Sequence, residues 1–238
     1  MMRRLIATGL FLMMTLTLAP VMAGPPWANA NDIRYMALGD SLAAGFAANP
    51  ATQGYVYRLY KQGVFAPTPN VLFSNSAVPG STSTDIVLFQ LPQVGRFSPD
   101  VVTLSTGGND LLSILGGADP PVVLGTFQLN LIDILTTLCT SASPPTVIIG
   151  NQYTIPPIID AVPGGEFILG QFNLIIHGVV AGAQATGCDV RVADVHSAFL
   201  GRRGLLLIEK NGASPFEVHP TNAGYGVMAD AFREAWQN

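Results

Sequence analysis

The sequence predicts a three-layer α/β/α domain built around a parallel sheet of about five strands. Five short apolar runs recur along the chain, and segments with helical periodicity separate them. Four of the runs are rich in Val and Ile and are apolar almost throughout, which is typical of strands buried on both faces of a parallel sheet. The five runs are residues 33–38, 71–74, 101–105, 147–150 and 190–193.

The segments between these runs predict the helices of the two outer layers. They are residues 55–62, 84–91, 122–140, 166–186 and 222–236. In the last one Tyr225, Met228, Phe232 and Trp236 recur at spacings of three or four, which gives one apolar face. Alternating strands and helices predict right-handed crossovers. With 238 residues and 49% hydrophobic composition, the chain is long enough for one large domain.

The N-terminus resembles an export signal, so we divide the chain into a signal peptide with a short N-terminal segment (1–30) and a single domain (31–238). Arg3 and Arg4 precede an apolar stretch at residues 5–18, and small residues near Ala23 and Ala30 offer cleavage sites. We therefore expect a secreted, extracytoplasmic protein without stable membrane insertion. An uncleaved anchor is the alternative, although the apolar stretch is short for a bilayer span.

The charge pattern excludes one class of partner. Only 11% of the residues are charged and the isoelectric point is about 5.2. No cluster of Lys or Arg could neutralise a phosphate backbone, so nucleic acid is not an expected partner. Loss of Arg3 and Arg4 would remove two of the 11 basic side chains against 15 acidic ones, which takes the formal charge from −4 to −6.

The two cysteines, Cys139 and Cys188, predict a structural disulfide. Each lies at the end of a predicted helix and shortly before a predicted strand, so neighbouring parallel strands would bring both to the same edge of the sheet. An exported protein meets oxidising conditions in which such a bond persists. Two buried free cysteines are the alternative.

Ser41 follows the first predicted strand within the stretch Gly39-Asp40-Ser41-Leu42. Ligands of open parallel sheets bind outside the carboxyl ends of the strands, so this serine is a candidate nucleophile. Asp and Ser beside Gly are also ordinary turn residues. The segments after the other strands should reach the same edge and decide between these interpretations.

Two hydrogen-bond donors are expected near Ser41. Gly80 follows the second strand and can present its backbone N–H closely to a ligand. Asn109 follows the third strand and carries a side-chain amide. Such donors are what an acyl-transfer oxyanion requires, although both residues also suit ordinary loops.

A serine nucleophile needs a base, and the chain holds only His177, His196 and His219. His177 falls within a helical apolar segment, and His196 follows the fifth strand. His219 is the best placed, because Pro220 can begin the terminal helix and fix the backbone next to it.

These residues together resemble the GDSL, or SGNH, hydrolase family. Gly39-Asp40-Ser41-Leu42 is similar to its first block, Gly80 to its second, the stretch 107–110 to its third and His219-Pro220 to its last. The resemblance implies the SGNH hydrolase fold, with a flavodoxin-like sheet. It further implies Ser41 as nucleophile, His219 as base, and the Ser41 N–H, Gly80 N–H and Asn109 amide as the oxyanion hole.

The sequence departs from that pattern at Phe216, where the family usually carries an Asp three residues before the His. Phe cannot accept a hydrogen bond from the imidazole. Three groups are candidates to orient the ring of His219: the carboxylate of Glu217, a backbone carbonyl, and the carboxylate of Asp194.

The segments after the third and fourth strands are predicted to be loops, and their apolar residues, including Leu111, Ile114, Tyr153 and Ile155, are expected to bind the substrate. They alternatively only cover the core. We therefore expect an esterase or lipase that acts on small-molecule or lipid esters with an apolar acyl group, through an acyl-enzyme and without metal or organic cofactor. A carbohydrate O-deacetylase, a thioesterase and a catalytically silent binding domain are the alternatives.

Overall fold

A five-stranded parallel sheet forms the centre of the molecule. The computed structural model describes residues 32–66, 70–207 and 218–238, so the expected signal peptide lies outside the described residues. The strands are ordered β2-β1-β3-β4-β5, and all four neighbouring pairs are parallel. This is a flavodoxin-like order, which confirms the predicted fold class.

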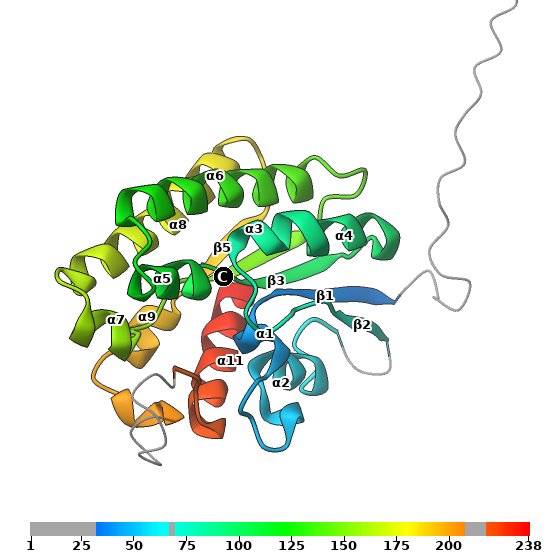
Figure 1. Ribbon diagram of the computed structural model, residues 1–238. Coiled ribbons are helices and arrows are strands. Elements are labelled where there is room, and N and C mark those ends of the chain that lie inside the picture. The colour runs from blue at the N-terminus through cyan, green and yellow to red at the C-terminus, as the bar shows by residue number, and fades with distance from the viewer. Residues whose placement is uncertain (1–31, 67–69, 208–217) are drawn as a thin grey trace, which may run out of the picture.

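The observed strands coincide with the five apolar runs to within one residue at each end. They are β1 (Ile33–Gly39), β2 (Val71–Asn75), β3 (Val101–Ser105), β4 (Thr146–Gly150) and β5 (Val190–Ala193). All residues of β3 are buried, because helices cover both faces of the sheet (Figure 1). Continuous apolar runs are therefore the correct pattern for these strands.

Helices form the two outer layers (Figure 1). One layer contains α3 (Ser83–Asp85), α4 (Leu91–Phe97), α6 (Pro120–Cys139) and α8 (Gly165–Ala185), and the other contains α2 (Tyr55–Lys61) and α11 (Asn222–Gln237). Short helices follow the carboxyl ends of the strands. They are α1 (Ser41–Ala44), α5 (Gly108–Leu115), α7 (Pro156–Ala161) and α9 (Val195–Phe199).

The structure contains helices in two segments where the sequence does not predict them. The sequence predicts loops in the apolar segments after β3 and β4, but these segments contain α5 and α7. Helix α7 begins with Pro156 and Pro157, positions where a missing N–H costs nothing. The predicted helix 84–91 extends to Phe97 and includes a wider turn, η2 (Ile86–Gln90). Helix α11 begins after Pro220, because Thr221 provides the cap.

Cys139 and Cys188 form a disulfide, as predicted. Their Cα atoms are 5.5 Å apart, and the bond joins the end of α6 to the segment that precedes β5. Both helices that flank this bond, α6 and α8, are long and apolar enough to cross a membrane by length and composition, and 28% of each apolar window is buried. In this fold they pack against each other on one face of the sheet (Figure 1).

Candidate active site

Gly39 sets the path of the backbone that leads to Ser41. Its φ angle is +139°, and a Cβ atom there would lie 2.2 Å from the carbonyl oxygen of Ser105. Only glycine fits so close to the neighbouring strand. The chain then turns away from the sheet, and Ser41 becomes the first residue of α1, where backbone N–H groups have no partner within the helix.

Asp40 stabilises this turn through hydrogen bonds of its buried side chain. Its carboxylate caps α1 by accepting a hydrogen bond from the Leu42 N–H at 2.9 Å, and it accepts another from the Ser105 hydroxyl at 3.1 Å. The side chain is buried, and burial raises the pKa of Asp40 to about 6 despite these hydrogen bonds. Asp40 thus fixes the backbone on which Ser41 is carried.

Ser41 and His219 meet although 178 residues separate them in the chain. The distance from Ser41 Oγ to His219 Nε2 is 2.8 Å, within hydrogen-bonding range. Both side chains are half-buried, so a substrate can reach them. A base at this distance is the arrangement that activates a serine hydroxyl.

The segment around His219 is held on both sides. The Leu207 N–H donates to the carbonyl of His219 at 2.9 Å, and the Tyr153 hydroxyl donates to the carbonyl of Val218. The ring of Phe46 packs against the imidazole, with 4.6 Å between ring centroids. These contacts place the imidazole before substrate arrives.

The other candidate groups lie in different surroundings. Asp194 caps α9: its carboxylate accepts from the Ser197 N–H at 3.1 Å and from the Asn151 amide at 2.9 Å. No hydrogen bond joins it to His219 among the described residues, so Asp194, one of the three candidates to orient the ring, is engaged with other partners. Glu217 and Phe216 lie outside the described residues.

His177 and His196 are not placed to be the base. His177 is exposed on α8. Nδ1 of His196 lies 3.0 Å from the carbonyl oxygen of Gln152, and the ring lines a separate cavity of about 420 Å³ that does not include Ser41.

Asn109 lies beside Ser41, and its amide is tied to the segment that carries Gly80. The Asn109 Nδ2 donates to the carbonyl of Ser81 at 2.8 Å, which leaves its second N–H for another acceptor. Gly80 is exposed and has a φ angle of +87°. The structure therefore brings Asn109 and the turn that contains Gly80 to the edge where Ser41 lies.

A small cavity adjoins Ser41 and has a volume of about 20 Å³. Two of the residues proposed for substrate contact, Tyr153 and Ile155, line it, and so does Leu112. Leu111 and Ile114 are buried in the core and do not line it. The reason is that α5 turns successive side chains to different faces.

Sequence reasoning also missed a positioning residue, Gln90. Its side chain donates to the carbonyl of Gly39 and accepts from the Gly39 N–H, each at 2.8 Å. No pattern in the sequence predicts a role for Gln90, because its side chain is directed toward the core only by the wider helical turn η2. Within the described ranges, no group of three or more His, Cys, Asp or Glu side chains is placed to hold a metal ion.

Comparisons with known proteins agree with this geometry. No curated protein sequence gives a significant match. Among solved structures, a lipase from a goat rumen metagenome is 24% identical with a TM-score of 0.66, and the match covers 85% of this chain and 97% of that one. An acetylxylan esterase from Geobacillus stearothermophilus is 17% identical with a TM-score of 0.67 over 85% and 93% of the two chains.

A third structure comes from a lipolytic protein of the G-D-S-L family of Veillonella parvula. It is 20% identical, with a TM-score of 0.63 over 87% of this chain and 99% of that one. At these identities the structures establish a shared fold. The model of the GDSL-like lipase/acylhydrolase family matches residues 37–227, which include Ser41 and His219. The chain therefore belongs to the GDSL-like lipase/acylhydrolase family.

Proposed function

We propose that this protein hydrolyses carboxylic esters through a covalent acyl-enzyme on Ser41. The observation that carries the proposal is the 2.8 Å separation of Ser41 Oγ and His219 Nε2. Family membership supports a hydrolase, and the geometry supplies a nucleophile with a base in hydrogen-bonding range.

In the first half of the reaction, Ser41 Oγ attacks the ester carbonyl carbon while His219 Nε2 takes the hydroxyl proton. The new C–O bond forms as the carbonyl π bond breaks, and the electron pair moves to the carbonyl oxygen. Collapse of this intermediate expels the alkoxide, which receives the proton from His219. The alcohol leaves, and the acyl group stays on Ser41.

The oxyanion of this intermediate would accept hydrogen bonds from the Ser41 N–H, the Gly80 N–H and the second N–H of Asn109. Losing one such donor typically costs about 3 to 4 kcal/mol of transition-state stabilisation. In the second half, His219 removes a proton from water, the resulting hydroxide attacks the acyl carbon, and the proton returns to Ser41 as the carboxylic acid is released.

The cavity beside Ser41 supports esters with a short, apolar acyl group. Its volume of about 20 Å³ is room for about one water-sized group, such as the methyl group of acetate. Leu112, Tyr153 and Ile155 give it apolar walls. A longer acyl chain would have to leave the cavity toward solvent, with little of its surface buried.

The same cavity favours a second candidate, removal of O-acetyl groups from a carbohydrate. The acetyl methyl fits the cavity, and the sugar would lie outside it. The acetylxylan esterase with a similar fold acts on such an ester. A thioesterase and a silent binding domain are the further alternatives.

The experiment is a hydrolysis series of p-nitrophenyl esters from acetate to palmitate, with Ser41→Ala as the control. We expect turnover of acetate and propionate, a steep decline at longer chains, and no turnover by Ser41→Ala. Acetylated xylan in the same assay separates the two candidates by release of acetate. A folded wild-type protein that hydrolyses no ester and takes no fluorophosphonate label on Ser41 would instead be a binding domain.

We also propose that the protein is exported, because residues 1–30 carry the charge and hydropathy pattern of a signal peptide. Expression of the full chain in a secreting bacterial host, followed by mass determination of the protein in the medium, tests this. Cleavage after Ala23 or Ala30 is the expected result. A full-length chain that stays with the membrane fraction would contradict it.

A further inference from the structure

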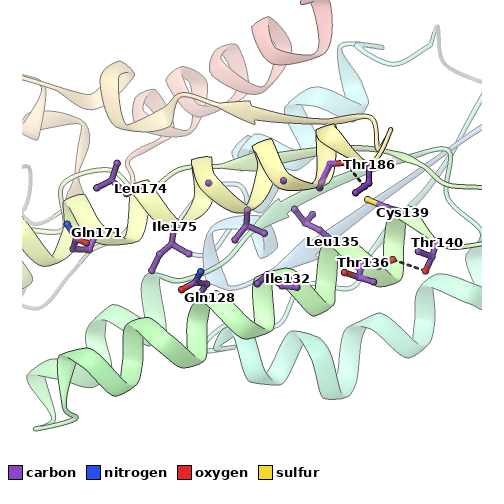
Figure 2. A pocket seen from close by; sticks show the side chains of 14 residues that line it. Gln128, Ile132, Leu135, Thr136, Cys139, Thr140, Gln171, Leu174, Ile175 and Thr186 are labelled. Atoms are coloured by element: carbon purple, nitrogen blue, oxygen red, sulfur yellow. Dashed lines mark hydrogen bonds between the residues drawn. The ribbon is translucent and has the colours of Figure 1, made fainter.

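The outer surface of α6 and α8 is unusually apolar. The two helices run side by side, and Figure 2 shows Gln128 of α6 near Ile175 of α8 and Cys139 near Thr186. Leu129 is 69% exposed, and Leu174 is 64% exposed. We call the exposed surface formed by Leu129, Ile132, Leu174, Gly178 and Gly182 the α6–α8 face. Large exposed apolar patches on soluble domains mark interaction sites.

A groove of about 770 Å³ runs between the two helices on this face. Ile132, Leu135, Ile175 and Val179 line its walls (Figure 2). Gly178 and Gly182 lie one turn apart on α8, and a Cβ atom at either would meet no atom within 4 Å. The groove is therefore open along α8 and lets another chain approach the helix backbone closely.

The face contains both a groove and ridges that could fill one. Leu174 of α8 lines the groove and is still 64% exposed, and Leu129 of α6, next in sequence to the lining residue Gln128, is 69% exposed. In a two-fold symmetric pair, the same patch of each copy meets the other, so the ridge of one copy can enter the groove of the other. A face with both features can pair with its own copy.

The size of the face also fits a second copy. Helices of 20 and 21 residues span about 30 Å, and two adjacent helices are about 20 Å wide. Contact along the whole of both helices would therefore have a footprint of at most about 600 Å² per copy. Stable pairs bury about 800 Å² per partner, with a range that begins near 600 Å².

The charges on these helices favour a protein partner over a lipid surface. The ionisable side chains of α6 and α8 are Asp133, Glu166 and His177, and neither helix contains Lys or Arg. Helices that lie on anionic membranes carry basic residues on their polar face. The two carboxylates would be repelled by such a surface.

We propose that the α6–α8 face is the surface through which two copies of this chain form a two-fold symmetric dimer. The disulfide at Cys139, which lines one end of the groove, holds α6 and the segment after α8 in fixed relation. The face belongs to a helical layer rather than to the sheet edge that carries Ser41 (Figure 1). Ester hydrolysis is therefore independent of this contact.

The test is sedimentation velocity of the protein purified from expression of the full chain, with its N-terminus determined by mass spectrometry. Over a wide range of protein concentration, we expect a species of twice the chain mass. Leu129→Glu and Leu174→Glu place a charge in the contact and should raise the dissociation constant by more than about tenfold. Leu88→Glu is the matched control, because Leu88 is 58% exposed outside this face.

Gly178→Glu is a further face variant that should not disturb folding. A Cβ atom at Gly178 would meet no atom within 4 Å, and glycine is a poor helix former. It should yield a monomer with the wild-type circular-dichroism spectrum and with ester hydrolysis unchanged. A wild-type protein that stays monomeric at every concentration would overturn the proposal. So would a dimer that all three face variants leave intact, or a monomer that co-sediments with phosphatidylcholine–phosphatidylglycerol vesicles through Leu129 and Leu174.

Discussion

Gln90 pairs with Gly39 through both ends of its carboxamide. The Gly39 N–H donates to Gln90 Oε1, and Gln90 Nε2 donates to the Gly39 carbonyl, each at 2.8 Å. Gly39 ends β1, two residues before Ser41, and Gln90 is 1% exposed. A side chain thus takes the place of a neighbouring strand where the backbone leaves the sheet, and buried backbone groups stay paired.

Gln90→Leu should therefore lower both stability and turnover. It leaves the Gly39 N–H buried without a partner, at about 1 to 3 kcal/mol, and removes one of two donors from the Gly39 carbonyl, which still accepts from the Val78 N–H at 3.0 Å. Urea unfolding measures the loss, and ester hydrolysis should show a lower kcat because Ser41 is less well fixed. Gln93→Leu is the control, because Gln93 is exposed on α4. Equal stability of the two variants would contradict the role of Gln90.

Gly39→Ala should give no folded protein. The new Cβ atom would lie 2.2 Å from the Ser105 carbonyl oxygen, which belongs to the backbone of β3 and cannot move aside. Circular dichroism and soluble yield report the outcome. Gly95→Ala, at an open position in α4, should fold and gain up to about 1 kcal/mol. A Gly39→Ala protein with the wild-type melting temperature would show that β1 and β3 are less tightly apposed.

Asp40→Asn should stabilise the protein at pH 8 and leave it unchanged at pH 4. The folded pKa of Asp40 is about 6, above the ordinary 3.8, because the carboxyl is buried. Its stabilising contribution is therefore present below pH 3.8 and is lost as the pH rises through 6. Asn retains an acceptor oxygen for the cap and carries no charge, so the gain at pH 8 is about 3 kcal/mol.

Asp194→Asn provides the opposite sign for comparison. Partial burial raises the pKa of Asp194, but its hydrogen bonds to Ser197 and Asn151 have the larger effect. The pKa of Asp194 is therefore lowered below the ordinary 3.8. Its contribution is present above pH 3.8 and is lost as the pH falls, so this variant should be less stable at pH 8. Thermal melts of both variants at pH 4 and 8 give the comparison. If the melting temperatures of both variants changed in the same direction relative to the wild type at pH 8, the opposite pKa directions of Asp40 and Asp194 would be contradicted.

Replacing Cys139 and Cys188 together with Ser should destabilise the fold. The bond closes a loop with a sequence separation of 49, for which the loss of unfolded-chain entropy is worth about 4 kcal/mol. Denaturant unfolding of the wild type with and without dithiothreitol measures it. The reductant should lower wild-type stability and leave the double variant unchanged. Two reactive thiols in the unfolded, unreduced wild type would show that the bond is absent.

The strands were predictable because burial on both faces leaves a strong apolar signal, whereas their flavodoxin-like order was implied by the family resemblance. Residues 101–105 and 190–193 were predicted with the observed bounds of β3 and β5. Helices α5 and α7 were missed because they are short, with eight and six residues, and lie only a few residues after strand ends. An eight-residue helix offers little periodicity, and its apolar side chains resemble a loop that covers the core.

At the site, Ser41 and His219 were predictable from short motifs, and the structure brings them within 2.8 Å. The side chains that hold the segments around Ser41 and His219 in place were not predictable in this way. Tyr153 holds the carbonyl of Val218 across 65 residues, and Gln90 holds Gly39 across 51. Polar side chains of this kind carry no periodicity, and only the fold decides which of them meets a backbone group.

Leu112→Ala should widen the preference for acyl chain length. Leu112 lines the cavity of about 20 Å³ beside Ser41, and shortening it makes room for further carbon atoms. One methylene in an apolar pocket changes kcat/KM by about tenfold or more. The ratio of kcat/KM for butyrate to that for acetate should therefore rise at least about tenfold. Leu115→Ala, on the same helix but outside the cavity, is the control. An unchanged ratio in Leu112→Ala, with acetate still hydrolysed, would mean that the acyl group does not occupy this cavity.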